Sequence, residues 1–263
     1  MGAVGTRDLT ARLLAELPDE PPWIETRAIL RSPHAQVFAG PVPADGVVAR
    51  LLHDAMSAVA VVGRPPAAAL AAALDGTTAM TPVVAQLENV SHVAALFAEI
   101  GPPGDGAEWR PERMLFHELT SAPVLPPLRA GASIRLLADS DALDHLPPGL
   151  RYEMSHARAM TETAAAFVDG VAASFCYACF KSEALWDVSI DTLDSHRGHG
   201  LAAHVVRFLI DRLRGERLEP MWGALESNTS SLRLAAKLGF TPSGANVVFS
   251  RGPWAYLTLG YTG

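Results

Sequence analysis

The sequence predicts an α/β protein with two domains, each a sheet flanked by helices, and three observations support this fold class. A chain of 263 residues is long enough for one large or two small domains. Hydrophobic residues make up 49% of the chain and charged residues 19%, a composition typical of chains that bury a core. Short apolar runs of strand character also alternate with stretches whose apolar residues recur at helical spacing.

Charge and hydropathy exclude several classes of partner. The chain has 21 Lys and Arg against 28 Asp and Glu, and the resulting net charge of −7 disfavours binding to nucleic acid or to an anionic membrane. The sequence contains no apolar run of the ~18 residues that a membrane-spanning helix needs. The first 20 residues carry Asp8, Glu16 and Asp19 and lack the apolar stretch of a signal peptide. We therefore expect a cytoplasmic protein.

A proline-rich stretch divides the chain near residue 130. Pro123, Pro126 and Pro127, followed by Arg-Ala-Gly, indicate a linker between domains 1–130 and 131–263. The first domain contains no motif that carries chemistry. We expect helices 9–17, 65–74 and 91–100 and strands 58–62 and 82–87. Ser91 is the expected N-cap of the last of these helices.

The second domain has sharper signals. Asp169-Gly170 between two apolar runs predicts a tight β-hairpin. An N-cap signal at 139–141 predicts a short helix over 142–146. In chain order we expect strand 133–137, helices 142–146 and 150–160, strands 163–168, 171–180 and 184–193, helix 200–214, strand 221–225, helix 228–238 and strands 247–250 and 255–259.

The two cysteines have the spacing of a redox CxxC motif but lie in a strand pattern. Cys176 and Cys179 are three residues apart, and in a strand such residues point to opposite faces. A disulfide would need their side chains to face one another. We therefore expect two cysteines that pack in the interior.

The segment 192–202 joins a predicted strand to a predicted helix through a glycine-bearing turn. The first N–H groups of a helix have no internal acceptor, and the helix dipole adds partial positive charge there. Gly198 and Gly200 allow close approach of a ligand, and Arg197 and His199 add side-chain donors. An ordinary turn would fit a lone GxG, but the pattern is also typical of an anion site.

This segment resembles the phosphate-binding loop of the GNAT superfamily of acyl-CoA-dependent N-acetyltransferases. Arg197-Gly-His-Gly-Leu-Ala202 matches the family pattern Q/R-x-x-G-x-G/A. Downstream, Asn228 to Phe240 is similar to the family helix N-x-x-S-x-x-L-x-x-K-x-G-F. The resemblance covers about residues 132–250 and implies the GNAT fold, a mixed and mostly antiparallel splayed sheet.

The resemblance implies a transferase that uses acetyl-CoA as cosubstrate, without a metal. The pantetheine arm would lie between strands 184–193 and 221–225 and bond to the main chain of Thr192 and Leu193 by strand addition. Asn228 and Ser231 would contact the cofactor from the second helix. The expected diphosphate-binding residues are Arg197, Gly198, His199, Gly200, Leu201 and Ala202.

An acceptor amine must lose a proton before it attacks a thioester, so the site needs a base. Asp187, Ser189 and Asp191 alternate along the expected strand 184–193 and therefore share one face. Either this face is partly solvated and its acids play no part in the reaction, or the acids serve the reaction. By the resemblance Asp187 is the first candidate base and Asp191 the second, and binding a cationic amine is an equal role for both.

One departure from the family pattern concerns the general acid. Many members carry a tyrosine four residues before the Gly-Phe pair, and this chain has Ala235 there. The thiolate then leaves unassisted, or Ser231 or water protonates it. The departure also keeps a second function open, that of a non-catalytic acyl-CoA-binding sensor or interaction module.

Other candidates favour structural roles. Glu153 and His156 lie three residues apart on the predicted helix 150–160, where the resemblance implies the acceptor pocket, but an exposed side-chain pair is the simpler interpretation. Trp186 and Trp222 fit packing roles. His196, His199 and His204 have no further ligand at zinc spacing.

The role of domain 1–130 is open. Its alternation of strands and helices permits a degenerate second copy of the same fold without a phosphate loop. It would form a wall of the acceptor pocket or a surface for a homodimer.

Overall fold

The computed structural model describes residues 6–40, 42, 45–53, 56–101 and 107–251. The chain forms two compact units, one built from Met1–Leu115, Leu225–Ser227 and Gly244–Trp254, the other chiefly from Phe116–Ala224 and Asn228–Ser243. The division runs through strands β5 (Arg110–Leu119) and β11 (Phe240–Ser250), so both units use part of each strand. It therefore differs from the expected single boundary at residue 130.

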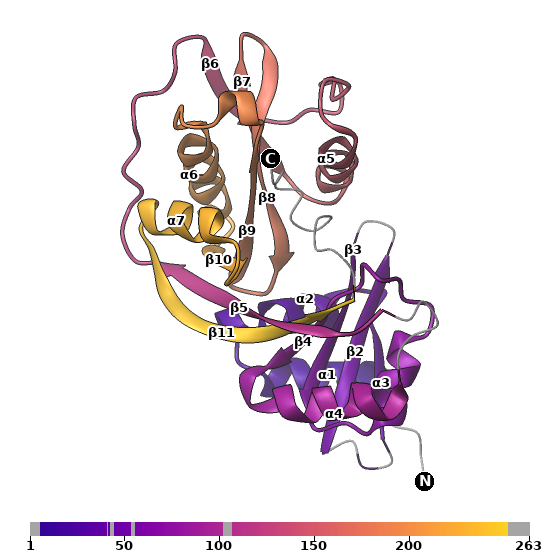
Figure 1. Cartoon of the computed structure of the whole chain (residues 1–263). Helices are drawn as coiled ribbons and strands as arrows, with labels where there is room; N and C mark the ends of the chain where they lie inside the picture. The colour runs from indigo at the N-terminus through magenta and orange to yellow at the C-terminus, as the bar shows by residue number, and fades with distance from the viewer. Residues whose placement is uncertain (1–5, 41, 43–44, 54–55, 102–106, 252–263) are drawn as a thin grey trace. The chain divides into compact units, whose positions relative to one another are not determined.

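The first unit is a sheet of β1, β2, β3 and β4 with parts of β11 and β5, and it has helices on both faces (Figure 1). Its strands lie in the order β1-β2-β3-β4-β11, with β3 and β4 parallel and the other pairs antiparallel. One core cluster includes Leu70 and Phe97 and the other includes Leu13 and Ile29. The elements are α1 (Thr6–Glu16), α2 (Ile24–Arg31), β1 (Gln36–Ala39), β2 (Gly46–His53), β3 (Met56–Gly63), α3 (Ala67–Leu74), β4 (Val83–Gln86) and α4 (Val90–Ile100).

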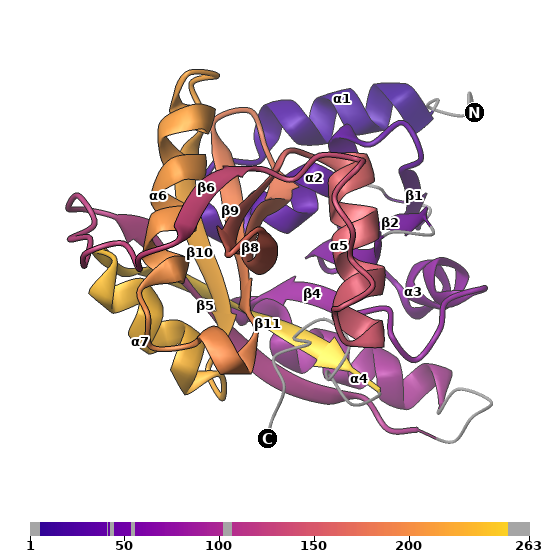
Figure 2. The same ribbon diagram turned by 90° about the horizontal axis from the view of Figure 1, so that it is seen from above.

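The second unit places its strands in the order β6-β7-β8-β9-β10. Figure 2 shows α5 and α6 on opposite sides of these strands. The core on the α6 side includes Trp186 and Leu209, and that on the α5 side includes Met154 and Phe175. The elements are β6 (Ala132–Leu136), α5 (Pro148–Met160), β7 (Thr163–Val168), β8 (Val171–Lys181), β9 (Leu185–Thr192), α6 (Leu201–Arg214), β10 (Glu219–Leu225) and α7 (Thr229–Lys237).

The two units repeat one order of elements. Each has three successive antiparallel strands, a helix, a strand parallel to the third, a second helix and a final strand. The recurrence agrees with the expectation that the N-terminal half is a second copy of the same architecture. The mixed sheet flanked by helices confirms the predicted fold class.

The hairpin prediction is confirmed in detail. Asp169 and Gly170 join β7 to β8 with φ angles of 51° and 83°, the positive values that a two-residue type I′ turn requires. Neither cysteine forms a disulfide, as expected, but only Cys176 is buried, whereas Cys179 is half-buried. Trp186 and Trp222 are fully buried packing residues.

Two local predictions are wrong. Asn89, rather than Ser91, occupies the N-cap of α4, because a 3₁₀ turn over Leu87–Asn89 leads directly into the helix. No helix forms over 142–146, a stretch of turns before α5. The sequence prediction also omitted α2, β1, β2 and β5, and the candidate strand 255–259 lies outside the described residues.

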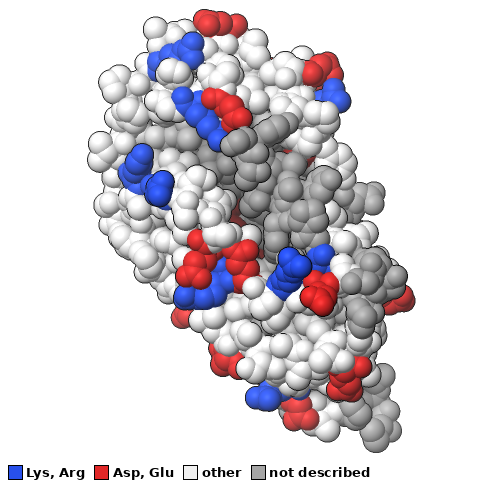
Figure 3. Space-filling model, viewed as in Figure 1, with Lys and Arg blue, Asp and Glu red and all other residues white. Residues whose placement is uncertain are grey.

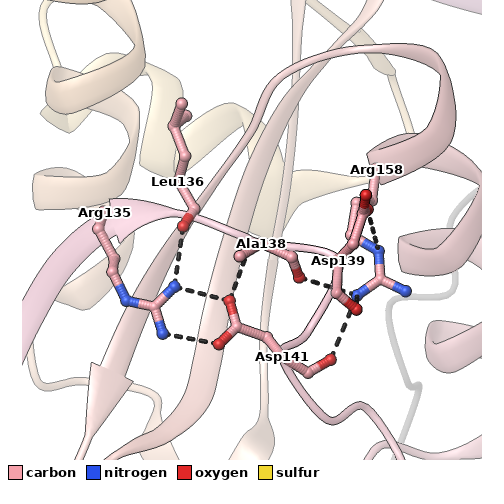
Figure 4. A network of polar contacts seen from close by, with 6 residues as sticks. All are labelled: Arg135, Leu136, Ala138, Asp139, Asp141 and Arg158. Carbon is pink, nitrogen blue, oxygen red and sulfur yellow. Dashed lines mark hydrogen bonds and ion pairs between the residues drawn. The ribbon is translucent and has the colours of Figure 1, made fainter.

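A polar network explains why the segment before α5 is not helical (Figure 4). The Asp141 carboxylate accepts two hydrogen bonds from Arg135 and one from the N–H of Ala138, at 2.6–2.7 Å. Arg158 of α5 donates to the carbonyl oxygens of Ala138, Asp139 and Asp141. These bonds to main-chain groups of residues 138–141 stabilise a turn in place of the predicted helix.

Candidate functional site

Strands β9 and β10 pair only at their beginnings. The parallel register joins Leu185–Asp187 to Glu219–Met221. Beyond these residues β9 continues to Thr192 and β10 to Leu225, and the two strands no longer pair with each other. The N–H of Leu193 donates to Ala173 on β8 (2.9 Å). Strand alternation therefore turns the main-chain groups of three residues toward the β10 side: Val188, Ile190 and Thr192.

This arrangement changes the expected contact of Leu193. Its N–H is held by Ala173 and is not available to a ligand. The carbonyl oxygen of Thr192 accepts a hydrogen bond from Arg197 Nε (3.2 Å). The main-chain groups that remain on the open side of β9 are those of Val188 and Ile190 and the N–H of Thr192.

Asp187 lies at the point where the two strands part. Its Oδ1 accepts a hydrogen bond from the N–H of Gly223 on β10 (2.8 Å). A Cβ atom at Gly223 would lie 3.3 Å from both carboxylate oxygens and 3.4 Å from the Phe116 ring. The absence of a side chain at residue 223 thus lets the Asp187 carboxylate take the place of a strand partner.

The start of α6 presents unused main-chain donors. Gly198 and the N-cap Gly200 have φ angles of 78° and 75°, and no side chain caps the helix. Within the helix, the carbonyl of Gly200 accepts from the N–H groups of Ala203 and His204. Among the described residues, no acceptor meets the amides of residues 198–202. Such a group of donors at a helix N-terminus suits an anion.

The side chains of this turn add local positive charge. Arg197 is exposed and forms an ion pair with Asp194 (2.9 Å), and His199 is exposed. On the face seen in Figure 3, basic and acidic side chains lie next to one another in small groups.

Gly200 is constrained by a second contact. Its added Cβ would lie 2.4 Å from Cγ of Pro126, and the Pro126 carbonyl is 2.8 Å from His204 Nε2. The segment expected to be a linker therefore packs on the first turn of α6. Gly200 is required by this close approach as well as by its positive φ angle.

Asn228 and Ser231 fix α7. Oδ1 of the N-cap Asn228 accepts from the N–H of Ser231 (3.1 Å). Ser231 Oγ in turn accepts from Nε1 of the buried Trp222 (2.9 Å). Both residues of the second motif thus have structural partners in the protein itself.

The acidic face of β9 lies on the α5 side. Ser189 is the register partner of Tyr177, and Asp191 that of Phe175. The Tyr177 hydroxyl donates to Oε1 of Glu153 on α5 (2.8 Å). Oε2 of Glu153 is buried and meets no donor among the described residues.

Glu153 and Asp191 are a coupled pair of carboxyl groups. Burial raises the pKa of Glu153 to about 8, and repulsion from Asp191 contributes to this rise. Burial also raises the pKa of Asp191, against the opposing charge of Arg197. Ionised carboxylates offer only acceptors, so a hydrogen bond between the two groups requires a proton on one of them.

Sequence reasoning undervalued this cluster. It treated Glu153 and His156 as an exposed pair, but both are half-buried. The His156 ring lies 4.0 Å from the Tyr152 ring at a tilt of 40°, with its Nδ1 2.8 Å from the Tyr152 carbonyl oxygen. It gave Tyr177 no role. The available signal was strand alternation, because Tyr177 and Phe175 point to one face of the predicted strand and face the acids of the next.

The equivalent turn in the first unit lacks these features. Between β3 and α3, Gly63 is followed after one residue by Pro65 and Pro66, which have no N–H to donate. The register of β3 with β4 covers Val83–Ala85 and leaves out only Gln86, which pairs with Asn246 of β11 on the other side of the strand. The first unit therefore offers neither the row of amides nor the divergent strands.

The described residues contain neither a candidate metal site nor a candidate membrane-spanning helix. They include no group of three or more His, Cys, Asp or Glu arranged to hold a metal ion. None of their helices has the length and apolar character needed to cross a membrane.

Comparisons with known proteins agree with this geometry. Residues 164–249 match the family GNAT acetyltransferase. No curated protein matches the sequence.

Solved structures share the fold over nearly the whole chain. A GCN5-related N-acetyltransferase-like protein from Streptococcus suis has a TM-score of 0.64 at 18% identity and covers 95% of this chain and 99% of its own. A tandem GNAT protein from the clavulanic acid biosynthesis pathway has a TM-score of 0.56 at 18% identity and covers 94% of both chains. A GCN5-related N-acetyltransferase from Kribbella flavida has a TM-score of 0.55 at 16% identity, with coverage of 95% and 98%.

Proposed function

We propose that this protein, whose residues 164–249 match the GNAT acetyltransferase family, is an N-acetyltransferase. It transfers the acetyl group of acetyl-CoA to a primary amine of a small molecule or protein, by direct attack in a ternary complex. The observation that carries the proposal is the set of amides at residues 198–202, where α6 begins, which meet no acceptor among the described residues.

The residues present fit the cosubstrate. Acetyl-CoA would supply the reactive thioester and a diphosphate that the amides of Gly198, His199, Gly200, Leu201 and Ala202 would bind, with Arg197 nearby. The open main-chain edge at Val188 and Ile190 supports binding of the pantetheine arm by strand addition. Thr192 and Leu193 would border this arm with their side chains, and Asn228 and Ser231 would support the site by holding α7.

The acidic face of β9 supports proton transfer from the amine. Asp187 and Asp191 are the candidate bases, and a main-chain N–H of β9 is the donor that we assign to the oxyanion. Ala235 is buried on α7 and Ser231 Oγ is engaged by Trp222, so neither position favours a protein acid for the leaving thiolate. Departure as the anion, or with a proton from water, fits these contacts.

Gly198 is the best position at which to test the diphosphate site. Nothing lies within 4 Å of a Cβ added there, whereas a side chain at Gly200 would collide with Pro126. Gly198→Glu and Gly198→Gln share the strain of a positive φ angle and differ only in charge. We expect Gly198→Glu to abolish acetyl-CoA binding in calorimetry and Gly198→Gln to keep most of it, because only the carboxylate repels a diphosphate. Equal affinity of both variants would contradict the site.

A second candidate function is a non-catalytic acyl-CoA sensor, and Ala235 is the residue that favours it. The two functions differ in whether thiol is released. Wild-type protein incubated with acetyl-CoA and a broad panel of primary amines, followed by mass spectrometry, should give acetylated product if the protein is a transferase. Tight acetyl-CoA binding without product from any amine would favour the sensor.

A further inference from the structure

Among the described residues, Glu153 and Asp191 form an acidic pair on the α5 side of the sheet, and no basic side chain is hydrogen-bonded to either of them. Glu153 Oε1 is satisfied by the Tyr177 hydroxyl, whereas Oε2 is buried and finds no donor among the described residues. The group that interacts with it from β9 is the carboxyl of Asp191. Two acceptors in contact are stable only with a proton between them.

The titratable and charged groups that act on the pair come from β8 and from the turn after β9. Tyr177 of β8 donates to Glu153, the Cys176 thiol interacts electrostatically with Asp191, and the guanidinium of Arg197 opposes the charge of Asp191. Arg197 lowers the pKa of Asp191, but its contacts are with Asp194 and the Thr192 carbonyl. No full counter-charge therefore offsets the burial of two acids, a cost that structural packing alone would not favour.

We propose that Glu153 and Asp191 share one proton and act together as the proton acceptor for the substrate amine. Asp191 takes the proton, and Glu153 is the positioning residue that holds it, itself oriented by the Tyr177 hydroxyl. The inference rests on the proposed transferase function and deepens it. It also implies that the acceptor arrives as a cation, because the pair with one proton carries a single negative charge in a poorly solvated site.

The proton balance is complete. The ammonium gives one proton to the Asp191 carboxylate, which leaves a neutral amine beside a neutral carboxyl pair. The amine nitrogen then forms the C–N bond to the acetyl carbonyl carbon while the C–S bond breaks. Its second proton passes to water, the thiolate leaves as the anion and takes a proton from water, and the pair returns its extra proton to water.

A spectroscopic test does not depend on activity. The infrared spectrum of wild-type protein at pH 7 should contain a C=O component of a protonated carboxylic acid that vanishes as Glu153 ionises near pH 8. The buried Glu25, whose pKa is raised to about 7, adds a second component, so the measurement is the difference between spectra of the Glu25→Gln background with and without Glu153→Gln. Glu153→Gln should remove the component that titrates near pH 8, whereas Glu216→Gln, a matched change at an exposed acid, should keep it. Absence of a Glu153-dependent component at pH 7 would overturn the shared proton.

A kinetic test addresses the role in the reaction. The probe is the primary amine that gives the fastest thiol release in the panel described above. The ratio of wild-type to Glu153→Gln kcat/KM cancels the ionisation of that amine. It should fall severalfold as pH rises through 8, because the wild-type pair then loses its shared proton whereas the variant keeps a neutral donor at every pH. Tyr177→Phe should move this fall to higher pH, because the hydroxyl stabilises the ionised form of Glu153. Acetyl-CoA affinity should not change in either variant.

The outcomes separate the two proposals. A wild-type to Glu153→Gln ratio that is independent of pH would refute the role of Glu153 even if the infrared band is present. Failure of every amine to react would refute the transferase proposal and, with it, the use of the pair. The infrared band would still report on the shared proton in that case.

Discussion

Asp187 combines a candidate chemical role with a structural one. Its Oδ1 satisfies the N–H of Gly223 at the point where β9 and β10 separate. A buried N–H without an acceptor costs about 1–3 kcal/mol, so the carboxylate stabilises the divergence of the strands. Strand alternation predicted which face Asp187 occupies, but the contact with Gly223 comes from a residue 36 positions away.

The two roles of Asp187 are separable by substitution. Asn at this position retains an Oδ1 that can accept from Gly223 but has no charge. Asp187→Asn would lower kcat at neutral pH and leave acetyl-CoA affinity nearly unchanged only if Asp187, rather than Asp191, accepts the amine proton, as measured by steady-state kinetics and calorimetry. A pH–rate profile identical to that of the wild type would remove Asp187 as the base. Asp187→Ala should also reduce the free energy of unfolding, because it leaves the Gly223 N–H without an acceptor.

The elements that were predicted best are those with strong local signals. The hairpin needed positive φ angles at Asp169 and Gly170, and α6 followed from a glycine turn and an apolar stripe. The turn before α5 was mispredicted as a helix because Arg135 and Arg158 reach it from β6 and α5. Local sequence does not reveal such partners.

The second motif also shows that the sequence of a helix does not reveal its tertiary partners. Asn228 caps α7, and Ser231 connects it to Trp222 of β10. Removal of an N-cap side chain costs about 1 kcal/mol. We expect Asn228→Ala to lower the free energy of unfolding by roughly this amount in urea titrations and Asn228→Ser to retain most of it. An unchanged stability of Asn228→Ala would show that the cap contributes nothing.

At the scale of the whole molecule, strand β11 contributes to the core of the first unit although it lies far from that unit in the sequence. Residues 246–249 pair with β4, and Val247, Val248 and Phe249 are buried in the two cores of the first unit. The first unit therefore includes residues from the end of the chain. A division at residue 130 would separate this strand from its own core.

A fragment of residues 1–130 tests this arrangement. Burial of each of the three apolar side chains contributes about 1.5–3 kcal/mol, and their combined loss is comparable to the stability of a whole domain. We expect the fragment not to fold cooperatively, as followed by circular dichroism during thermal unfolding. Residues 240–251 appended through a flexible linker should restore the transition. A cooperative transition in the fragment alone would contradict the shared strand.

The sequence by itself determined the fold class, most helices and strands of the second unit and the phosphate-loop motif, because these depend on periodicity, glycine conformation and helix ends. Only the tertiary structure decided that Glu153 meets Asp191 and Tyr177, that Leu193 is held by Ala173 and that Pro126 lies on Gly200. The physical reason is that burial and hydrogen-bond partners arise from residues distant in the chain. Proton affinity and open main-chain groups follow from those partners, and local spacing does not encode them.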